Sequence, residues 1–358
     1  MQFSLLDAVK KRNIIVIGAS AGGIDALKKL LAPLPADLDA TLFIVWHMAP
    51  SMRSVVPHIL SSVTSIPTSH AVDGETIRTN HIYVASPDRH LLVEEGHIRI
   101  TRGPKENRFR PAIDPLFRSA AYSYGNRVIG LILSGALDDG SAGLWTIKQR
   151  GGLVLVQDPA EAEVPSMPER AIRQVAADYV MPAGQLARTV VTLAGQTVAP
   201  DGNVDTEETQ KTRLEIRVTA QEESGMTIFP FGELSPYTCP ECHGVLTMLK
   251  EGSLARYRCH TGHAYSVDTL LASVTEAIED NLYNTLRSMD EAMVLLNHLG
   301  DHYAEVNQPK LAALYFQKAQ ETQNRSDRVR QAVADNQILS QNNLWEQAGE
   351  LSPTDRSR

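Results

Sequence analysis

The sequence has little of what would place the protein outside the cell, in a membrane or on nucleic acid. Only three of its 358 residues are cysteines, too few for a disulfide framework, and all lie between Cys239 and Cys259. No run approaches the roughly 18 consecutive apolar residues that a membrane span needs. In the N-terminal stretch MQFSLLDAVKKRN the basic residues follow the apolar patch, the wrong order for a secretory signal. The net charge of −8 argues against a phosphate-binding surface. We therefore expect a cytoplasmic protein with no nucleic-acid partner and no direct membrane insertion.

The first half of the chain alternates strand patterns with helix patterns. From Asn13 to about Tyr179, short β-branched runs such as NIIVIG, TLFIVW and RVIGLILSG are each followed by an amphipathic segment. Apolar strands separated by helices predict a parallel sheet that is covered on both faces. The stretch HLLVEEGHIRIT predicts an inserted hairpin. The expected fold of residues 12–196 is therefore α/β, with a doubly wound, mostly parallel sheet and an inserted hairpin.

Beyond this domain the pattern changes three times. Residues 197–234 are polar, charged and poor in aromatic side chains, which is typical of a linker. A compact segment rich in cysteine and histidine follows at residues 235–266. Apolar residues then recur at spacings of three or four, which predicts a C-terminal helical hairpin over residues 267–338. Residues 339–358 are expected to form a frayed tail.

The stretch IIVIGASAGG near the N-terminus contains a candidate nucleophile. Gly18-x-Ser20-x-Gly22 matches the nucleophile-elbow pattern, in which small flanking residues allow a sharp turn that presents a serine hydroxyl at the end of a strand. A dinucleotide-binding loop would need glycine where Ser20 stands, and a Walker-type loop would need a Lys-Ser/Thr pair that does not follow. The pattern alone leaves a catalytic Ser20 and a purely structural turn equally open.

Polar residues after the neighbouring strands favour a catalytic Ser20. A nucleophilic serine needs a general base and a carboxylate that orients the base. His47 ends the strand in FIVWHMAP, and Asp138 and Asp139 follow the strand in RVIGLILSG. Because residues just beyond the carboxyl ends of parallel strands converge on one crevice, we expect a triad of Ser20, His47 and one of the two aspartates. Asp114-Pro115, by contrast, matches the cap and first turn of a helix.

The cysteine-rich segment has the spacing of a metal site. Cys239-x2-Cys242 is followed, after sixteen residues, by Cys259 and a run that contains His260 and His263. Two short pairs of Cys or His ligands, joined by a spacer long enough for a β-hairpin, supply four soft ligands in the tetrahedral arrangement that zinc prefers. His263, His260 and the earlier His243 are all candidates for the fourth ligand. Because protein side chains would fill all the coordination positions of the metal, we expect a structural zinc ion and a zinc ribbon.

Several motifs in one order resemble a known family. IGASAGG, VWHMAP, IYVASPDRHLLVEEGHIRI, FRPAIDPLFRSAA, LSGALDDGSAGL and VQDPAEAEVPSMPERAI are similar to the catalytic domain of the chemotaxis protein-glutamate methylesterases, the CheB type. The resemblance covers about residues 13–181. It implies that Ser20 is the nucleophile, His47 the base, and Asp139 rather than its neighbour the orienting acid. The GHAYS context also resembles the zinc ribbon of some stand-alone members, which favours His263 as the fourth ligand.

The resemblance also implies a function and partners. The reaction would be hydrolysis of glutamate γ-methyl esters in bacterial chemotaxis-type signal transduction, with deamidation of glutamine as a side activity and no catalytic cofactor. Backbone amides at the start of the helix after Gly22 would stabilise the oxyanion. The partners would be the cytoplasmic helices of methyl-accepting chemoreceptors, and a receptor methyltransferase or another signalling protein would be a further partner.

The chain departs from the family pattern in two respects. The family's T-G-M-G-x-D-G appears as SGALDDG, so Ala136 stands where a methionine lies close to the reacting carbonyl. Family members commonly carry an N-terminal phospho-acceptor domain, whereas about a dozen residues precede the first expected strand. We therefore expect no activation by phosphorylation of the same chain, and a docking or regulatory role for the ribbon and hairpin. Two alternative functions remain: a non-catalytic signalling scaffold, and a small-ester or amide hydrolase outside chemotaxis.

Overall fold

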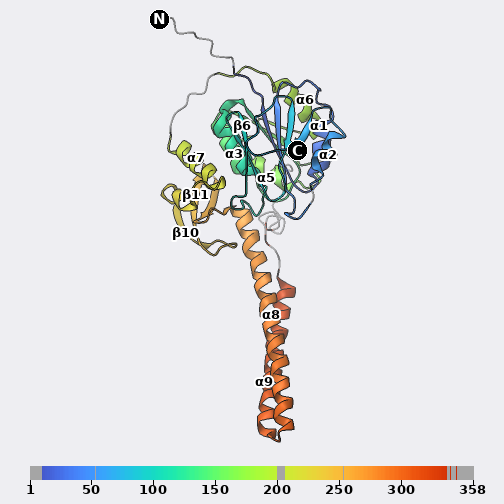
Figure 1. Ribbon diagram of the computed structural model, residues 1–358, viewed down its shortest axis with the longest axis vertical. Coiled ribbons are helices and arrows are strands. Elements are labelled where there is room, and N and C mark those ends of the chain that lie inside the picture. Colours follow the sequence, from blue (N-terminus) through green and yellow to red (C-terminus); the bar gives the residue numbers. More distant parts are fainter. Residues whose placement is uncertain are drawn as a thin grey trace. The chain divides into compact units, whose positions relative to one another are not determined.

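The computed structural model describes residues 10–52, 54–199, 206–252 and 254–336, together with Leu339 and Leu344. The chain forms two units, which we describe separately, and the division between Leu270 and Leu271 falls within a long helix, α8 (Val267–Glu305). Figure 1 shows the elements along the chain. Apart from two leucines, the tail expected at 339–358 lies outside the described residues.

A seven-stranded sheet forms the centre of the first unit. Its strands are β1 (Ile14–Ala19), β2 (Thr41–Trp46), β3 (Thr68–His70), β4 (His81–Val84), β7 (Val128–Ile132), β8 (Leu153–Gln157) and β9 (Tyr179–Met181). The order is β3-β4-β2-β1-β7-β8-β9, and each pair of neighbours is parallel. The fully buried β1 therefore lies between β2 and β7. The predicted doubly wound parallel sheet is confirmed.

Helices cover both faces of this sheet. They are α1 (Gly23–Leu31), α2 (Val56–Ser61), α3 (Ile113–Tyr124), α4 (Ser141–Gln149), α5 (Ser166–Gln174) and α6 (Ala183–Leu193), with a short 3-10 helix, η1 (Gly125–Arg127). Ile15 and Ile17 of β1 pack in one core with α1, α2 and α6, whereas Ile14 and Val16 pack in another with α3, α4 and α5. Figure 1 shows α1, α2 and α6 on one side of the strands and α3 on the other. Alternate residues of a strand buried on both faces thus build two cores.

Two antiparallel elements accompany the central sheet. The hairpin β5 (His90–Glu94) and β6 (His97–Thr101) lies at the expected insertion. A four-stranded sheet, which we name the ribbon sheet, contains β10 (Glu233–Thr238), β11 (Val245–Glu251), β12 (Leu254–Cys259) and β13 (Ala264–Ser266) in sequential order. The ribbon sheet belongs to the same unit as the central sheet.

Part of the segment expected to be a linker is folded. It contains helix α7 (Glu207–Thr219) and the 3-10 helix η2 (Gly225–Phe231). Val218 of α7 and Ile228 of η2 form a small buried core with Leu249 of the ribbon sheet. The expectation of a linker was wrong for these residues, because two of the charged residues that suggested exposure, Lys211 and Glu215, are buried and ion-paired.

A buried network of ion pairs joins α7 to the ribbon sheet and to the domain formed by the central sheet and its covering helices, which we call the central domain. Glu215 of α7 lies 2.7 Å from Arg256 and 3.1 Å from Arg258, both of β12. Arg258 also lies 2.9 Å from Glu106, which pairs at 3.0 Å with Arg118 of α3. Burial alone would raise the pKa of Glu106, but Arg118 and Arg258 hold it well below its ordinary value. The central domain, α7 and the ribbon sheet therefore share one set of compensating charges.

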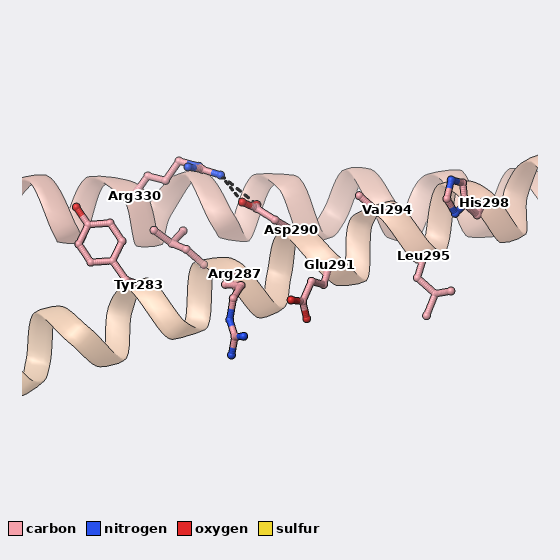
Figure 2. Close-up of a pocket in the computed structure, with 9 residues that line it drawn as sticks. Tyr283, Arg287, Asp290, Glu291, Val294, Leu295, His298 and Arg330 are labelled. Carbon is pink, nitrogen blue, oxygen red and sulfur yellow. Dashed lines mark hydrogen bonds and ion pairs between the residues drawn. The ribbon is translucent and has the colours of Figure 1, made fainter.

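The second unit contains the helical hairpin expected from the apolar spacing. Helix α8 pairs with α9 (Pro309–Asp335), and Arg330 of α9 lies 2.9 Å from Asp290 of α8. Near the turn, the rings of Tyr303 and Tyr315 stack with their centroids 5.3 Å apart. Figure 2 shows a groove along α8 beside the Asp290–Arg330 ion pair. Among the described residues, no helix combines the length and apolar character that crossing a bilayer would take.

Replacing Glu215 with glutamine tests the buried network. The variant should lower the free energy of unfolding by about 3–5 kcal/mol, because it leaves the buried guanidinium groups of Arg256 and Arg258 with less compensating charge. Exposed Glu222, which pairs with Arg99 at 3.3 Å, offers a matched control. Glu222→Gln should cost less than about 1 kcal/mol in the same urea titration. Equal effects of the two variants would contradict the assignment of the network as a major source of stability.

Candidate active site and metal cluster

Ser20 lies in the turn between β1 and α1. Its amide donates a hydrogen bond to the carbonyl of Ser134, at a distance of 2.9 Å, which ties the turn to the segment after β7. Gly22 has a φ of 69°, and a Cβ atom there would lie 2.6 Å from the Glu163 Cβ and 2.7 Å from the Ser134 Oγ. Only glycine fits these two constraints. The small residues of the sequence motif therefore allow the serine to leave the strand at its carboxyl end.

His47 comes directly after β2 and faces both of its predicted partners. Its Nδ1 lies 3.2 Å from the Ser20 Oγ, and its Nε2 lies 2.7 Å from the Asp139 Oδ2. The backbone amide of His47 donates to the carbonyl of Ala19, which fixes the end of β2 beside the end of β1. A neutral ring that donates from Nε2 to Asp139 leaves Nδ1 as the acceptor for the serine proton.

Asp139 follows β7 and is surrounded by hydrogen-bond donors. Besides His47, the backbone amides of Ile113 and Asp114 donate to its carboxylate at 2.7 and 3.2 Å, and the Asn107 Nδ2 donates at 2.8 Å. Burial alone would raise the pKa of Asp139, but the bonds from His47, Ile113 and Asn107 lower it below its ordinary value. The structure thus brings Ser20, His47 and an ionised Asp139 together.

The neighbouring aspartate makes different contacts. Asp138 is buried, and its Oδ1 accepts a hydrogen bond from the Ser266 Oγ at 2.5 Å. Burial and the charge of Asp268 raise the pKa of Asp138 to about 7. Of the two aspartates that the sequence left open, Asp139 is the one bonded to His47, and Asp138 is bonded to the end of the ribbon sheet.

Asp114 does not cap its helix as expected. The N-cap position of α3 is Ala112, and Asp114 lies in the first turn. Its carboxylate accepts hydrogen bonds from the amide of Gly143 at 2.6 Å and from the Asn107 Nδ2 at 2.8 Å. Burial and the charge of Asp139 raise the pKa of Asp114 to about 8. The capping interpretation was wrong because this side chain bonds to other elements instead of to the amides of its own helix.

Sequence reasoning did not identify two further residues beside the triad. The ring of Phe109 stacks on the imidazole of His47, with centroids 3.7 Å apart and planes 9° apart. Asn107 contacts Asp139 and Asp114 through one amide nitrogen. Both residues lie in the stretch ENRFRP, which has no helix or strand periodicity. The only available signal was their place at one of the family motifs, FRPAIDPLFRSAA, which begins with Phe109 two residues after Asn107.

The raised pKa of Asp114 predicts a specific pH dependence of stability. In the folded protein Asp114 holds its proton up to about pH 8, whereas an unfolded aspartate loses it near pH ~4. The folded state therefore binds more protons in this range, and the free energy of unfolding should fall by up to about 1.4 kcal/mol per pH unit as the pH rises.

Urea titrations between about pH 5 and pH 7.5 measure this dependence. Asp114→Asn should flatten the slope, whatever its effect on absolute stability, because the group can no longer ionise. Asp37→Asn, at an exposed position, should leave the slope unchanged. An unaltered slope in Asp114→Asn would show that the carboxyl is already ionised in the folded protein.

Four side chains of the cysteine-rich segment converge on one point. The ligand atoms of Cys239, Cys242, Cys259 and His263 all lie within 4.8 Å of one another. The Sγ atoms of Cys242 and Cys259 are 3.6 Å apart, and the His263 Nδ1 is 3.6 Å from the Cys259 Sγ. A tetrahedron of ligands about ~2.3 Å from a zinc ion has edges of nearly this length. The donor set and spacing therefore fit a four-coordinate metal ion.

The other two histidines are not in this cluster. His260 lies against Gly244, where a Cβ atom would come 2.2 Å from the His260 Nδ1. His243 has a φ of 59° in the turn after Cys242. Neither belongs to the group of four ligand atoms, so the geometry favours His263 among the three candidates that the spacing left open.

Comparison with known proteins places this site in a family. The family model described as CheB methylesterase matches residues 15–190. A relative from Leptospira interrogans is 39% identical over 180 residues, and the match covers 50% of this chain and 93% of that protein. A Photorhabdus laumondii protein named protein-glutamate methylesterase/protein-glutamine glutaminase is 40% identical over 177 residues, 48% of this chain and 50% of that one.

The similarity also extends to a solved structure. The crystal structure of the Thermotoga maritima CheB methylesterase catalytic domain is 31% identical, and its match covers 52% of this chain and 100% of that chain with a TM-score of 0.49. The chain spans nearly all of the Leptospira relative but about half the length of the Photorhabdus protein. The extent and identity of the Leptospira match show that this chain belongs to the CheB methylesterase family.

Proposed function

We propose that this chain is a serine hydrolase that removes methyl esters from glutamate γ-carboxyls on the cytoplasmic helices of chemoreceptors, in bacterial chemotaxis-type signalling. One observation carries the proposal: Ser20, His47 and Asp139 lie in hydrogen-bonding order at the carboxyl ends of three neighbouring parallel strands. The name of the Photorhabdus relative supports the substrate and adds deamidation of glutamine as a related activity. The reaction would take place in the cytoplasm, where these receptor helices lie.

The geometry suits a two-step acyl transfer. The Ser20 Oγ attacks the ester carbonyl while the His47 Nδ1 takes its proton, and Asp139 stabilises the imidazolium through the Nε2–H. His47 then returns the proton to the departing methoxide, which leaves as methanol. A water molecule, deprotonated by His47, hydrolyses the acyl-serine and releases the glutamate carboxylate.

The turn after β1 also supplies donors for the oxyanion. The amides of Ser20 and Gly23 donate to the carbonyls of Ser134 and Ser20. We assign the oxyanion to the amides of Ala21 and Gly22, which lie at the positive N-terminal end of α1. One such donor typically stabilises the transition state by about 3 kcal/mol.

Methanol release from methylated receptor fragments tests the proposed reaction. Ser20→Ala and Asp139→Asn should each lower kcat by about 10⁴-fold, because one removes the nucleophile and the other leaves His47 in the wrong tautomer. Ser61→Ala, which changes an exposed serine whose hydroxyl donates to the carbonyl of His58, should behave as wild type. Release that survives in Ser20→Ala would contradict a serine mechanism. Turnover of small esters without methanol release from any receptor would instead support a hydrolase outside chemotaxis.

We further propose that Cys239, Cys242, Cys259 and His263 bind a structural zinc ion. The converging donor set supports this, and four protein ligands close the coordination sphere, so the metal would stabilise the ribbon sheet and take no part in catalysis. The side chain of Glu241 lies 3.8 Å from the His263 Nε2, where it can orient the ring of this ligand.

Metal analysis of purified variants tests the zinc proposal. Wild-type protein should contain about one zinc ion per chain, and Cys242→Ser and His263→Ala should each lose most of it. His260→Ala should retain the metal, because its ring lies outside the ligand group. Full zinc content in His263→Ala together with loss in His260→Ala would move the fourth ligand to His260.

A further inference from the structure

Residues 105–109, which we name the coupling loop, lie between the ribbon sheet and the triad. The amide of Asn107 donates to the carbonyl of Ala264 at 2.8 Å, and the amide of Ala264 donates to the carbonyl of Lys105 at 3.3 Å. The loop therefore pairs with β13 through its backbone. Asn107 and Arg108 both have positive φ, 49° and 76°, at the centre of a tight turn closed by two bonds between Glu106 and Phe109.

The Asn107 side chain uses its full hydrogen-bonding capacity between the two parts. Its Nδ2 donates to the Asp139 Oδ1 and to the Asp114 Oδ2, each at 2.8 Å. Its Oδ1 accepts from the amide of Ser266 at 2.9 Å and from the Thr269 Oγ1 at 3.1 Å. The NH₂ group of a carboxamide can donate two hydrogen bonds and its oxygen can accept two, so these four bonds use the whole capacity of the side chain. Because the amide group is polar at both ends, the contacts from Ser266 and Thr269 fix which end faces the carboxylates.

The neighbours of Asn107 in the loop are held in the same way. Glu106 is paired with Arg258 of β12, and Lys105 lies 3.0 Å from Glu241 of the segment between β10 and β11. On the other side, Phe109 stacks on His47. The ribbon sheet thus holds one side of the loop while the other side contacts two members of the triad.

We propose that Asn107 is a positioning residue for Asp139, and that Ser266, at the end of the ribbon sheet, and Thr269, in the first turn of α8, set the orientation of its amide. The inference rests on the proposed function of the triad. Asp139 can orient His47 only while its own carboxylate is fixed, and Asn107 is the one side chain besides His47 that donates to it among the described residues. The end of the ribbon sheet therefore supports the triad through Asn107, although no described residue of the sheet is hydrogen-bonded to Ser20 or His47.

Kinetics of three variants test this inference. Asn107→Ala should lower kcat by about 10- to 100-fold with little change in KM, because it loosens a group that supports the reacting residues without removing a substrate contact. Thr269→Val keeps the shape of the side chain but removes its bond to Asn107, and should lower kcat several-fold. Thr247→Val is the control, because the Thr247 hydroxyl is buried in the ribbon sheet with no hydrogen-bond partner among the described residues. It should keep the wild-type kcat.

A second measurement tests the positioning role of Asn107 independently of the proposed substrate. The downfield proton signal of the imidazole Nε2–H reports the bond from His47 to Asp139 without any turnover. Asn107→Ala and Thr269→Val should shift or broaden it, and Thr247→Val should not. If wild type gives the signal but no methanol, the proposed substrate is wrong and the variants still test Asn107. An unchanged signal and kcat in Asn107→Ala, with only a lower melting temperature, would overturn the positioning role.

Discussion

The site depends on keeping the buried carboxylate of Asp139 ionised. A carboxylate that loses its water must recover the lost solvation from hydrogen-bond donors, or it takes up a proton. Asp139 obtains donors from three separate parts of the chain: His47 after β2, the first amides of α3, and Asn107 in the coupling loop. The N-terminus of α3 also carries a partial positive charge. Each of these elements must be in place for Asp139 to keep its negative charge beside His47.

The same requirement explains why the ribbon sheet and α7 are joined to the central domain. Glu106 and Glu215 are each about 1% exposed, and neither could be buried without the guanidinium groups that surround it. These charges come from α3, the coupling loop, α7 and β12, so the network can form only when all four are assembled. Charge compensation therefore contributes to specifying how α7 and the ribbon sheet attach.

The sequence was sufficient to predict those elements whose structure is determined by a local residue pattern. Long β-branched runs marked β1, β2 and β7, and the polar residues at their ends were therefore brought together as expected. The three-residue strands β3 and β9 are too short to show an alternating pattern of apolar residues. Helix α7 was mistaken for a linker because the sequence does not show which distant charges its charged residues pair with. Glu106 and Arg258 are separated by 152 positions. Asn107 was missed for a similar reason, since three of its four side-chain partners, Asp139, Ser266 and Thr269, lie 32 to 162 positions away. The catalytic roles themselves stay predictions.

The adjacent aspartates illustrate how environment outweighs residue type. Asp138 and Asp139 are both buried, yet the pKa of the first is raised to about 7 and that of the second is lowered. Asp138 has the hydroxyl of Ser266 and lies near the charge of Asp268, whereas Asp139 collects several donors. Ser266 is linked to both aspartates: its hydroxyl bonds to Asp138, and its amide bonds to Asn107, which in turn donates to Asp139. A displacement of this one residue would disturb both carboxyls together, so the end of the ribbon sheet is the point where the accessory elements act on the site.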